Sequence, residues 1–254
     1  MIQISIVNQS TAFDSSNLPS LAQALQTQVT RDLSSSEWGK TAQISYTPPG
    51  ENPIASNWVV GLFDDADVAG ALGYHDITPS GMPLSKIFVK PTLADGSLVS
   101  VATSHEVLEM LIDPDINLAA ELDDGANPPK FYAYEVADAV ELDIDGYDVT
   151  LPTGNIRVSN FVLPSWFEGF RTTGPFDFMN LLTSPFSLRP GGYIGVLDLS
   201  NLASGWQQVV ADGADEVTRL RARPHLGSRR MRRTIKRGNW VTSTYKPGMR
   251  AITV

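Results

Sequence analysis

Residues 103–114 read TSHEVLEMLIDP, and this stretch decides how the rest of the chain is interpreted. Its apolar side chains recur at the spacing of a helix that packs one face on a core, at Val107, Leu108 and Leu111. The Asp-Pro pair at its end indicates where that helix stops, because the residue before a proline avoids helical backbone. We therefore expect a helix over about residues 98–112.

Three residues of this expected helix carry ionisable side chains in the pattern H-E-x-x-E, namely His105, Glu106 and Glu109. Positions i and i+4 of a helix lie one above the other, so His105 and Glu109 can hold one metal ion together. Imidazole nitrogen and carboxylate oxygen both suit zinc, and the chain has no cysteine for a thiolate site. Glu106 stands beside this pair, where a general base would act. The alternative is an ordinary helix with a solvated polar edge.

A third ligand is expected from YAYEVADAVE, residues 132–141, which offers Glu135 and Asp138. If this segment is helical, both carboxylates share a face, and one can bind metal while the other orients His105. If it is extended, they point to opposite faces and one alone reaches the ion. We favour Glu135 as the ligand and Asp138 as the partner of His105.

The rest of the chain predicts an α+β fold in which helices pack on a mixed sheet. An apolar stripe after a first strand at residues 4–7 predicts one long helix over residues 16–38, with Ser15 and Ser16 as candidate N-caps. Further strands are expected at residues 42–48, 58–65, 71–76 and 86–91, and a hairpin around the Asp145-Gly146 pair within residues 140–151. Residues 160–195 indicate long ordered loops with a few short strands.

The motif SHEVLEMLIDP followed by YEVADAV resembles the zincin-like proteins that carry S-H-E on a helix and an acidic pair some residues later. The resemblance covers roughly residues 1–140. It implies a zincin-like mixed sheet, zinc at His105 and Glu109, a base at Glu106, and an acidic partner at Glu135 or Asp138. The carboxylate that replaces the second imidazole of H-E-x-x-H adds negative charge and weakens the metal as a Lewis acid. Versions of this pattern also look like proteins of tailed phages, in which the fold serves assembly.

Charge divides the 254-residue chain into two parts. Residues 219–254 contain eleven Lys and Arg and no acidic residue, whereas residues 1–218 contain eight basic and 28 acidic residues, so their net charges are +11 and −20. Such asymmetry indicates an interaction tail. We expect a zincin-like domain over residues 1–215, with a loop-rich, aromatic lobe at 152–215, followed by an extended basic C-terminal arm at 216–254.

The expected partners of the basic arm are neighbouring subunits. The acidic body of another copy or of another assembly protein complements its charge, which predicts a homo-oligomer or a larger assembly. Non-specific contact with nucleic acid is the alternative, and it would be strongly salt-dependent. Stacking aromatics are few, with Trp240 and Tyr245, so a sequence-reading module is not expected. The N-terminus lacks the pattern of a signal peptide and no stretch suits a membrane span, which favours a cytoplasmic or virion location.

Three further patterns have simpler explanations. The stretch ELDIDGYDV is faintly like a calcium loop but lacks the later glutamate, so a hairpin explains it. His75, beside Asp76, would donate to a developing oxyanion if it faced the site, and is otherwise a half-buried strand histidine. Packing of a loop-rich lobe explains a set of aromatic residues better than a pocket or an interface does: Trp166, Phe167, Phe170, Phe176, Phe178 and Phe186.

Two functions follow from the sequence. The first is a metallopeptidase-like domain that hydrolyses peptide bonds with zinc, or a degenerate version of one. The second is a non-catalytic virion or phage structural protein on a zincin-like scaffold, whose basic arm makes contacts between subunits. The H-E-x-x-E helix favours the first, and the charge division favours the second.

Overall fold

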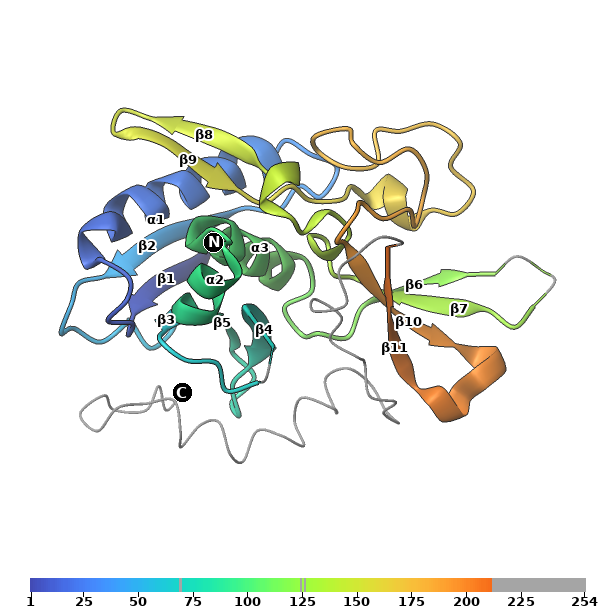
Figure 1. Cartoon of the computed structure of the whole chain (residues 1–254), viewed down its shortest axis with the longest axis horizontal. Helices are drawn as coiled ribbons and strands as arrows, with labels where there is room; N and C mark the ends of the chain where they lie inside the picture. Colours follow the sequence, from blue (N-terminus) through green and yellow to red (C-terminus); the bar gives the residue numbers. More distant parts are fainter. Residues whose placement is uncertain (69, 124, 126, 212–254) are drawn as a thin grey trace.

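The computed structural model describes residues 1–68, 70–123, 125 and 127–211, and they form an α+β fold, as predicted (Figure 1). The larger sheet has five strands in the order β2-β1-β3-β5-β4. In that order the strands are Ala42–Thr47, Ile2–Asn8, Trp58–Phe63, Pro83–Phe88 and Gly73–Ile77. The first four run parallel, and β4 pairs antiparallel with β5 at one edge. A mixed sheet is therefore present, with its antiparallel strand at the border.

The motif helix α3, Val99–Ile112, packs against β5 and β4. The Ser85 hydroxyl of β5 donates to the Glu106 carbonyl oxygen of α3 over 3.3 Å, which marks the sheet face that the helix covers. Twelve of the fourteen residues of α3 are buried, including all three ionisable residues of H-E-x-x-E. The alternative of a solvated polar edge is therefore wrong. A helix buried on nearly every side must find partners for its polar groups inside the protein.

The predicted long N-terminal helix is divided into shorter segments. A 3₁₀ turn, Ser15–Asn17, leads into α1, Leu18–Thr27, and then into a π-helical segment, Gln28–Leu33. The N-cap prediction is also wrong, since the Asp14 carboxylate accepts the Ser16 backbone N–H and Asn17 precedes α1. The apolar stripe still faces the core, but a local pattern cannot show where the helix widens. The wider turn begins at Gln28, whose side chain bonds to residues distant in sequence.

Gln28 links the N-terminal helix to the motif helix. Its amide nitrogen donates to the Ser159 carbonyl oxygen over 2.8 Å, and its amide oxygen accepts the Ser104 hydroxyl over 2.7 Å. The Ser104 oxygen in turn accepts the Ser159 backbone N–H over 3.0 Å. All three side chains are buried. Because Ser104 directly precedes His105, this network fixes the register of α3 at the start of the motif.

A second sheet and a separate hairpin complete the described fold. The sheet has the order β11-β10-β7-β6, formed by Trp206–Val210, Tyr193–Asp198, Lys130–Ala133 and Ala119–Leu122. The hairpin pairs β8, Tyr147–Leu151, with β9, Gly154–Val158, and lies along α1 (Figure 1).

The hairpin predicted around Asp145-Gly146 is wrong, because its expected first strand contains the 3₁₀ turn Asp143–Asp145 and follows another, Asp138–Val140, although its expected second strand forms β8. Buried Asp145 pairs with Arg189 over 3.0 Å, and the Asp143 carboxylate accepts the Leu98 backbone N–H at the start of α3. These long-range bonds hold residues 138–145 away from a strand conformation.

The remaining predictions agree with the structure only in part. The strand expected at residues 86–91 ends at Phe88 and continues as helix α2, Val89–Asp95, which the sequence did not indicate. Trp166, Phe167 and Phe176 are buried in the core, as a packed lobe predicts, whereas Phe170 is 79% exposed. The boundary placed near residue 215 and the basic arm lie outside the described residues.

Within residues 1–211, the three gaps aside, no helix has both the length and the apolar character needed to cross a bilayer.

Replacement of Gln28 by leucine is expected to destabilise the protein by about 2–3 kcal/mol, because it leaves the Ser104 hydroxyl and the Ser159 carbonyl without their buried partner. Urea unfolding followed by circular dichroism measures the difference. The control is Gln23→Leu on the exposed side of α1, where a change within about 0.5 kcal/mol is expected. Equal effects at the two positions would show that the network does not hold the helices together.

Candidate metal centre

Side chains from three parts of the fold meet at the buried face of α3. His105, Glu106 and Glu109 come from the helix itself. His75 comes from the edge strand β4, where it pairs with Ser85 and so shares the sheet face that α3 covers. Glu135 follows β7, and Asp138 begins a 3₁₀ turn. The turn and the edge strand thus approach the helix from separate directions.

The first group of donor atoms forms around His105. Its Nε2 atom lies 3.3 Å from Glu109 Oε1 and 3.1 Å from Asp138 Oδ1. The Ala137 backbone N–H also donates to Glu109 Oε1, over 3.2 Å, which orients this carboxylate. The donor atoms of His105, Glu109 and Asp138 lie within 4.8 Å of one another, so they can hold a metal ion.

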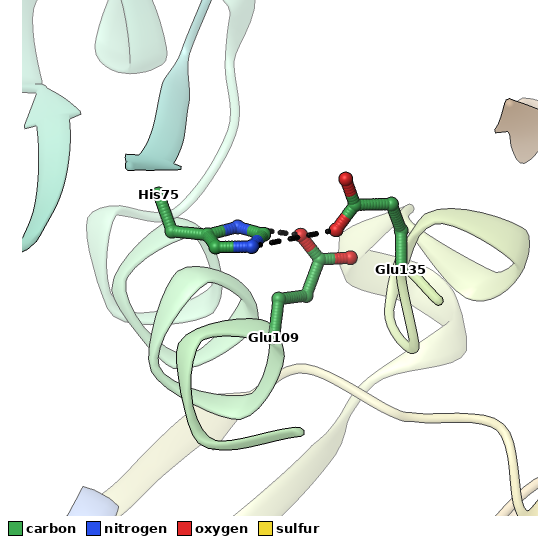
Figure 2. Close-up of side chains that lie close together, drawn as sticks. All are labelled: His75, Glu109 and Glu135. Atoms are coloured by element: carbon green, nitrogen blue, oxygen red, sulfur yellow. Dashed lines mark ion pairs between the residues drawn. The ribbon is translucent and has the colours of Figure 1, made fainter. Parts of the chain in front are cut away.

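The second group forms around His75, as Figure 2 shows. The Nδ1 atom of His75 lies 3.4 Å from Glu109 Oε2, and its Nε2 atom lies 3.6 Å from Glu135 Oε2. Donor atoms of these three residues also lie within 4.8 Å of one another. Glu106 borders this group, with its Oε2 atom 3.6 Å from His75 Nδ1.

The electrostatics of the cluster follow from burial and from crowded carboxylates. Burial alone would lower the pKa of His105, but the charges of Glu109, Asp138 and Glu106 outweigh it and hold that pKa well above its usual value. Burial would raise the pKa of Glu109, yet the two histidines hold it well below its usual value. Burial and the Glu109 charge raise the pKa of Asp138 to about 7, and burial raises that of nearby Glu141 to about 8. Acidic side chains therefore outnumber the two histidines in the cluster.

The residues present fit a divalent cation. All the named donors except Glu141 are buried, from His75 at 1% exposed to His105 at 8%. Among the described residues, the Glu106 Oε2 atom has no hydrogen-bond partner, although it is buried. Nitrogen and oxygen donors that converge in a buried, negatively charged cluster are what zinc and similar metals require.

The structure brings together every site residue that the sequence singled out, but in a different arrangement. His105, Glu106 and Glu109 share one helix, as expected. Glu135 and Asp138 both reach the cluster, because the chain between them turns and is neither a regular helix nor a strand. Asp138 approaches His105, whereas Glu135 approaches His75.

His75 was not identified from the sequence as a candidate metal ligand. The sequence raised it as a donor at the site and favoured a half-buried strand histidine, but its ring is 1% exposed and contacts three carboxylates. The available signal was its place on one of the two strands expected shortly before the motif helix. That signal is weak, because it does not reveal which face of the strand the helix covers.

Comparison of the chain with family models, with curated proteins and with solved structures finds no match. The interpretation of the centre therefore depends on its own residues.

Gly73 of β4 provides the space that Glu106 occupies. A Cβ atom at this position would lie 3.0 Å from Glu106 Oε1 and 3.0 Å from the Lys86 carbonyl oxygen. Such distances are tighter than ordinary contact, so a side chain here would force the Glu106 carboxylate or the edge strand to move. The glycine thus keeps the edge strand close to the motif helix.

Gly73→Ala is expected to destabilise the protein by about 1–3 kcal/mol through this overpacking. Thermal or urea unfolding measures the loss. In a Glu106→Ala background the Cβ atom meets less of the side chain, so the same substitution is expected to cost less, and the double-mutant cycle reports the difference. An identical loss in both backgrounds would mean that the Lys86 carbonyl, and not Glu106, sets the packing.

Proposed function

We propose that this chain is a zincin-like, metallopeptidase-like domain that hydrolyses peptide bonds with zinc held by His105, Glu109 and Asp138. The observation that carries the proposal is the meeting of the H-E-x-x-E helix with Asp138, where the donor atoms of the three residues lie within 4.8 Å of one another. The zincin-like resemblance implies a mixed sheet, and the motif helix packs against the antiparallel edge of one. The sequence favoured Glu135 as the third ligand and Asp138 as the partner of His105, whereas this proposal makes Asp138 the third ligand because its Oδ1 atom lies 3.1 Å from His105 Nε2.

Each residue of the motif has a separate task in this proposal. The ion, when bound, supplies Lewis-acid activation of water and of the peptide carbonyl. His105 and Glu109 hold it from one face of the helix, and the Ala137 N–H keeps the Glu109 carboxylate turned toward His105. Glu106 accepts the proton of the attacking water as general base. Contact with His75 and the space left by Gly73 keep its carboxylate in place.

Glu106→Gln is expected to retain zinc but to lower peptide hydrolysis by at least about 100-fold, because the amide cannot accept the proton. Elemental mass spectrometry measures zinc per chain, and a quenched fluorescent peptide library measures hydrolysis. The control is Glu121→Gln on the exposed side of β6, with unchanged activity expected. Turnover equal to wild type in Glu106→Gln would remove Glu106 as the base.

A second candidate function, assembly of a virion or a similar particle, is supported by the charge division of the chain. The last 36 residues carry a charge of +11 and residues 1–218 carry −20, so arm and body of neighbouring copies attract one another. In this role the cation stabilises the fold. The burial of the cluster suits it, because a structural ion needs no access for substrate.

Deletion of residues 219–254 is expected to give a folded monomer that no longer assembles, because the complementary charge is lost. Light scattering coupled to gel filtration measures the mass of each form. A full-length chain with the nine basic residues of 219–237 replaced by glutamine separates the effect of charge from that of length. Assembly of the truncated chain at wild-type level would contradict the proposed role of the arm.

A further inference from the structure

We propose that the buried cluster is a dinuclear centre, in which a second divalent cation is bound by His75, Glu109 and Glu135. This inference rests on the metal site of the proposed function and extends it, because Glu109 would bridge the two ions.

The geometry of Glu109 is the first argument. Its two carboxylate oxygens face different histidines, with Oε1 3.3 Å from His105 Nε2 and Oε2 3.4 Å from His75 Nδ1. Each histidine also has a carboxylate of its own, Asp138 for His105 and Glu135 for His75. Glu109 is therefore the one residue common to the two donor groups. A carboxylate that offers one oxygen to each of two donor groups has the arrangement of a bridging ligand.

Charge balance is the second argument. Five carboxylates gather at or beside the cluster: Glu106, Glu109, Glu135, Asp138 and Glu141. For the four that are buried, Glu106, Glu109, Glu135 and Asp138, ionised and with both histidines neutral as ligands, one divalent cation leaves two negative charges and two cations leave none. Buried charge without compensation is costly, so the second cation removes most of the penalty that the first leaves.

Glu106 supplies the third argument. It is 6% exposed, and its Oε2 atom has no hydrogen-bond partner among the described residues. That atom lies 3.6 Å from His75 Nδ1, on the side of the second group. A buried acceptor therefore faces the place where a second cation would lie. In hydrolases with two metal ions, the pair stabilises the attacking and leaving oxygens together, which suits a base at this position.

The donor set also indicates which cations would bind. Each group offers one imidazole nitrogen and two carboxylates, which suits Zn²⁺ or Mn²⁺ better than Ca²⁺ or Mg²⁺. Two histidines and several carboxylates are also the ligands of dinuclear carboxylate proteins, and here the carboxylates would be Glu109, Glu135 and Asp138. The competing occupant is a proton, since a protonated His75 could satisfy Glu109 and Glu135 without a metal.

The test is the number of zinc ions per chain. The full-length protein is saturated with ZnCl₂, freed of excess by gel filtration and measured by elemental mass spectrometry. The expected values are two for wild type, one for His75→Gln and one for His105→Gln. The matched control is His225→Gln, which changes the third histidine of the chain outside the described residues and is expected to keep two.

The outcomes separate this proposal from the proposed function. One zinc in wild type and in His75→Gln, with none in His105→Gln, would overturn the second site and keep the first. No zinc in wild type would overturn both. Because a variant can fail to fold, wild type loaded with Mn²⁺ provides a second measurement by electron paramagnetic resonance. Exchange coupling between two ions is expected, and a spectrum of isolated Mn²⁺ alone would overturn the dinuclear centre.

Discussion

The burial of helix α3 is the constraint on which the rest of the structure depends. A helix with twelve of fourteen residues buried places His105, Glu106 and Glu109 where water cannot solvate their charges. The surrounding elements must supply compensation, and they do so from two sides. The edge strand β4 contributes His75, and the chain after β7 contributes Glu135 and Asp138. The centre is thus a requirement of packing this particular helix into this fold.

The same constraint explains why residues remote from the centre matter to it. The hydrogen bonds of Gln28 with Ser104 and Ser159 link the motif helix to the N-terminal helix and to the chain directly after β9. At the opposite side, Gly73 lets β4 approach closely enough for Glu106 to lie between strand and helix. Buried polar networks of this kind rigidify a site when every member has its partner. The residues that position the candidate metal ligands are therefore also residues on which the stability of the fold depends.

The two functional proposals make different use of the same cluster. Hydrolysis needs the cations to be reached by a peptide, with Glu106 placed to take a proton. Assembly requires only that the cluster stabilise the fold. The opposite charges of residues 1–218 and 219–254 then attract neighbouring copies to one another. A dinuclear centre is compatible with either role, because two ions both neutralise the carboxylates and favour hydrolytic chemistry.

The sequence by itself determined the features that depend on neighbours along the chain. The helix over Val99–Ile112 and its stop at the Asp113-Pro114 pair follow from helical spacing, and the convergence of His105 and Glu109 follows from i and i+4. The strands β1, β2 and β3 follow from their β-branched and aromatic residues.

Only the tertiary structure decided the features that depend on distant residues. His75 and Glu109 are brought together by the packing of an edge strand on a helix, and Asp138 reaches His105 across 33 positions. The failed hairpin at Asp145 has the same cause, since its ion pair with Arg189 spans 44 positions. Periodicity describes which face of a segment is apolar, but it does not describe what that face will meet. The assignment of each carboxylate to its histidine was therefore decided by the fold.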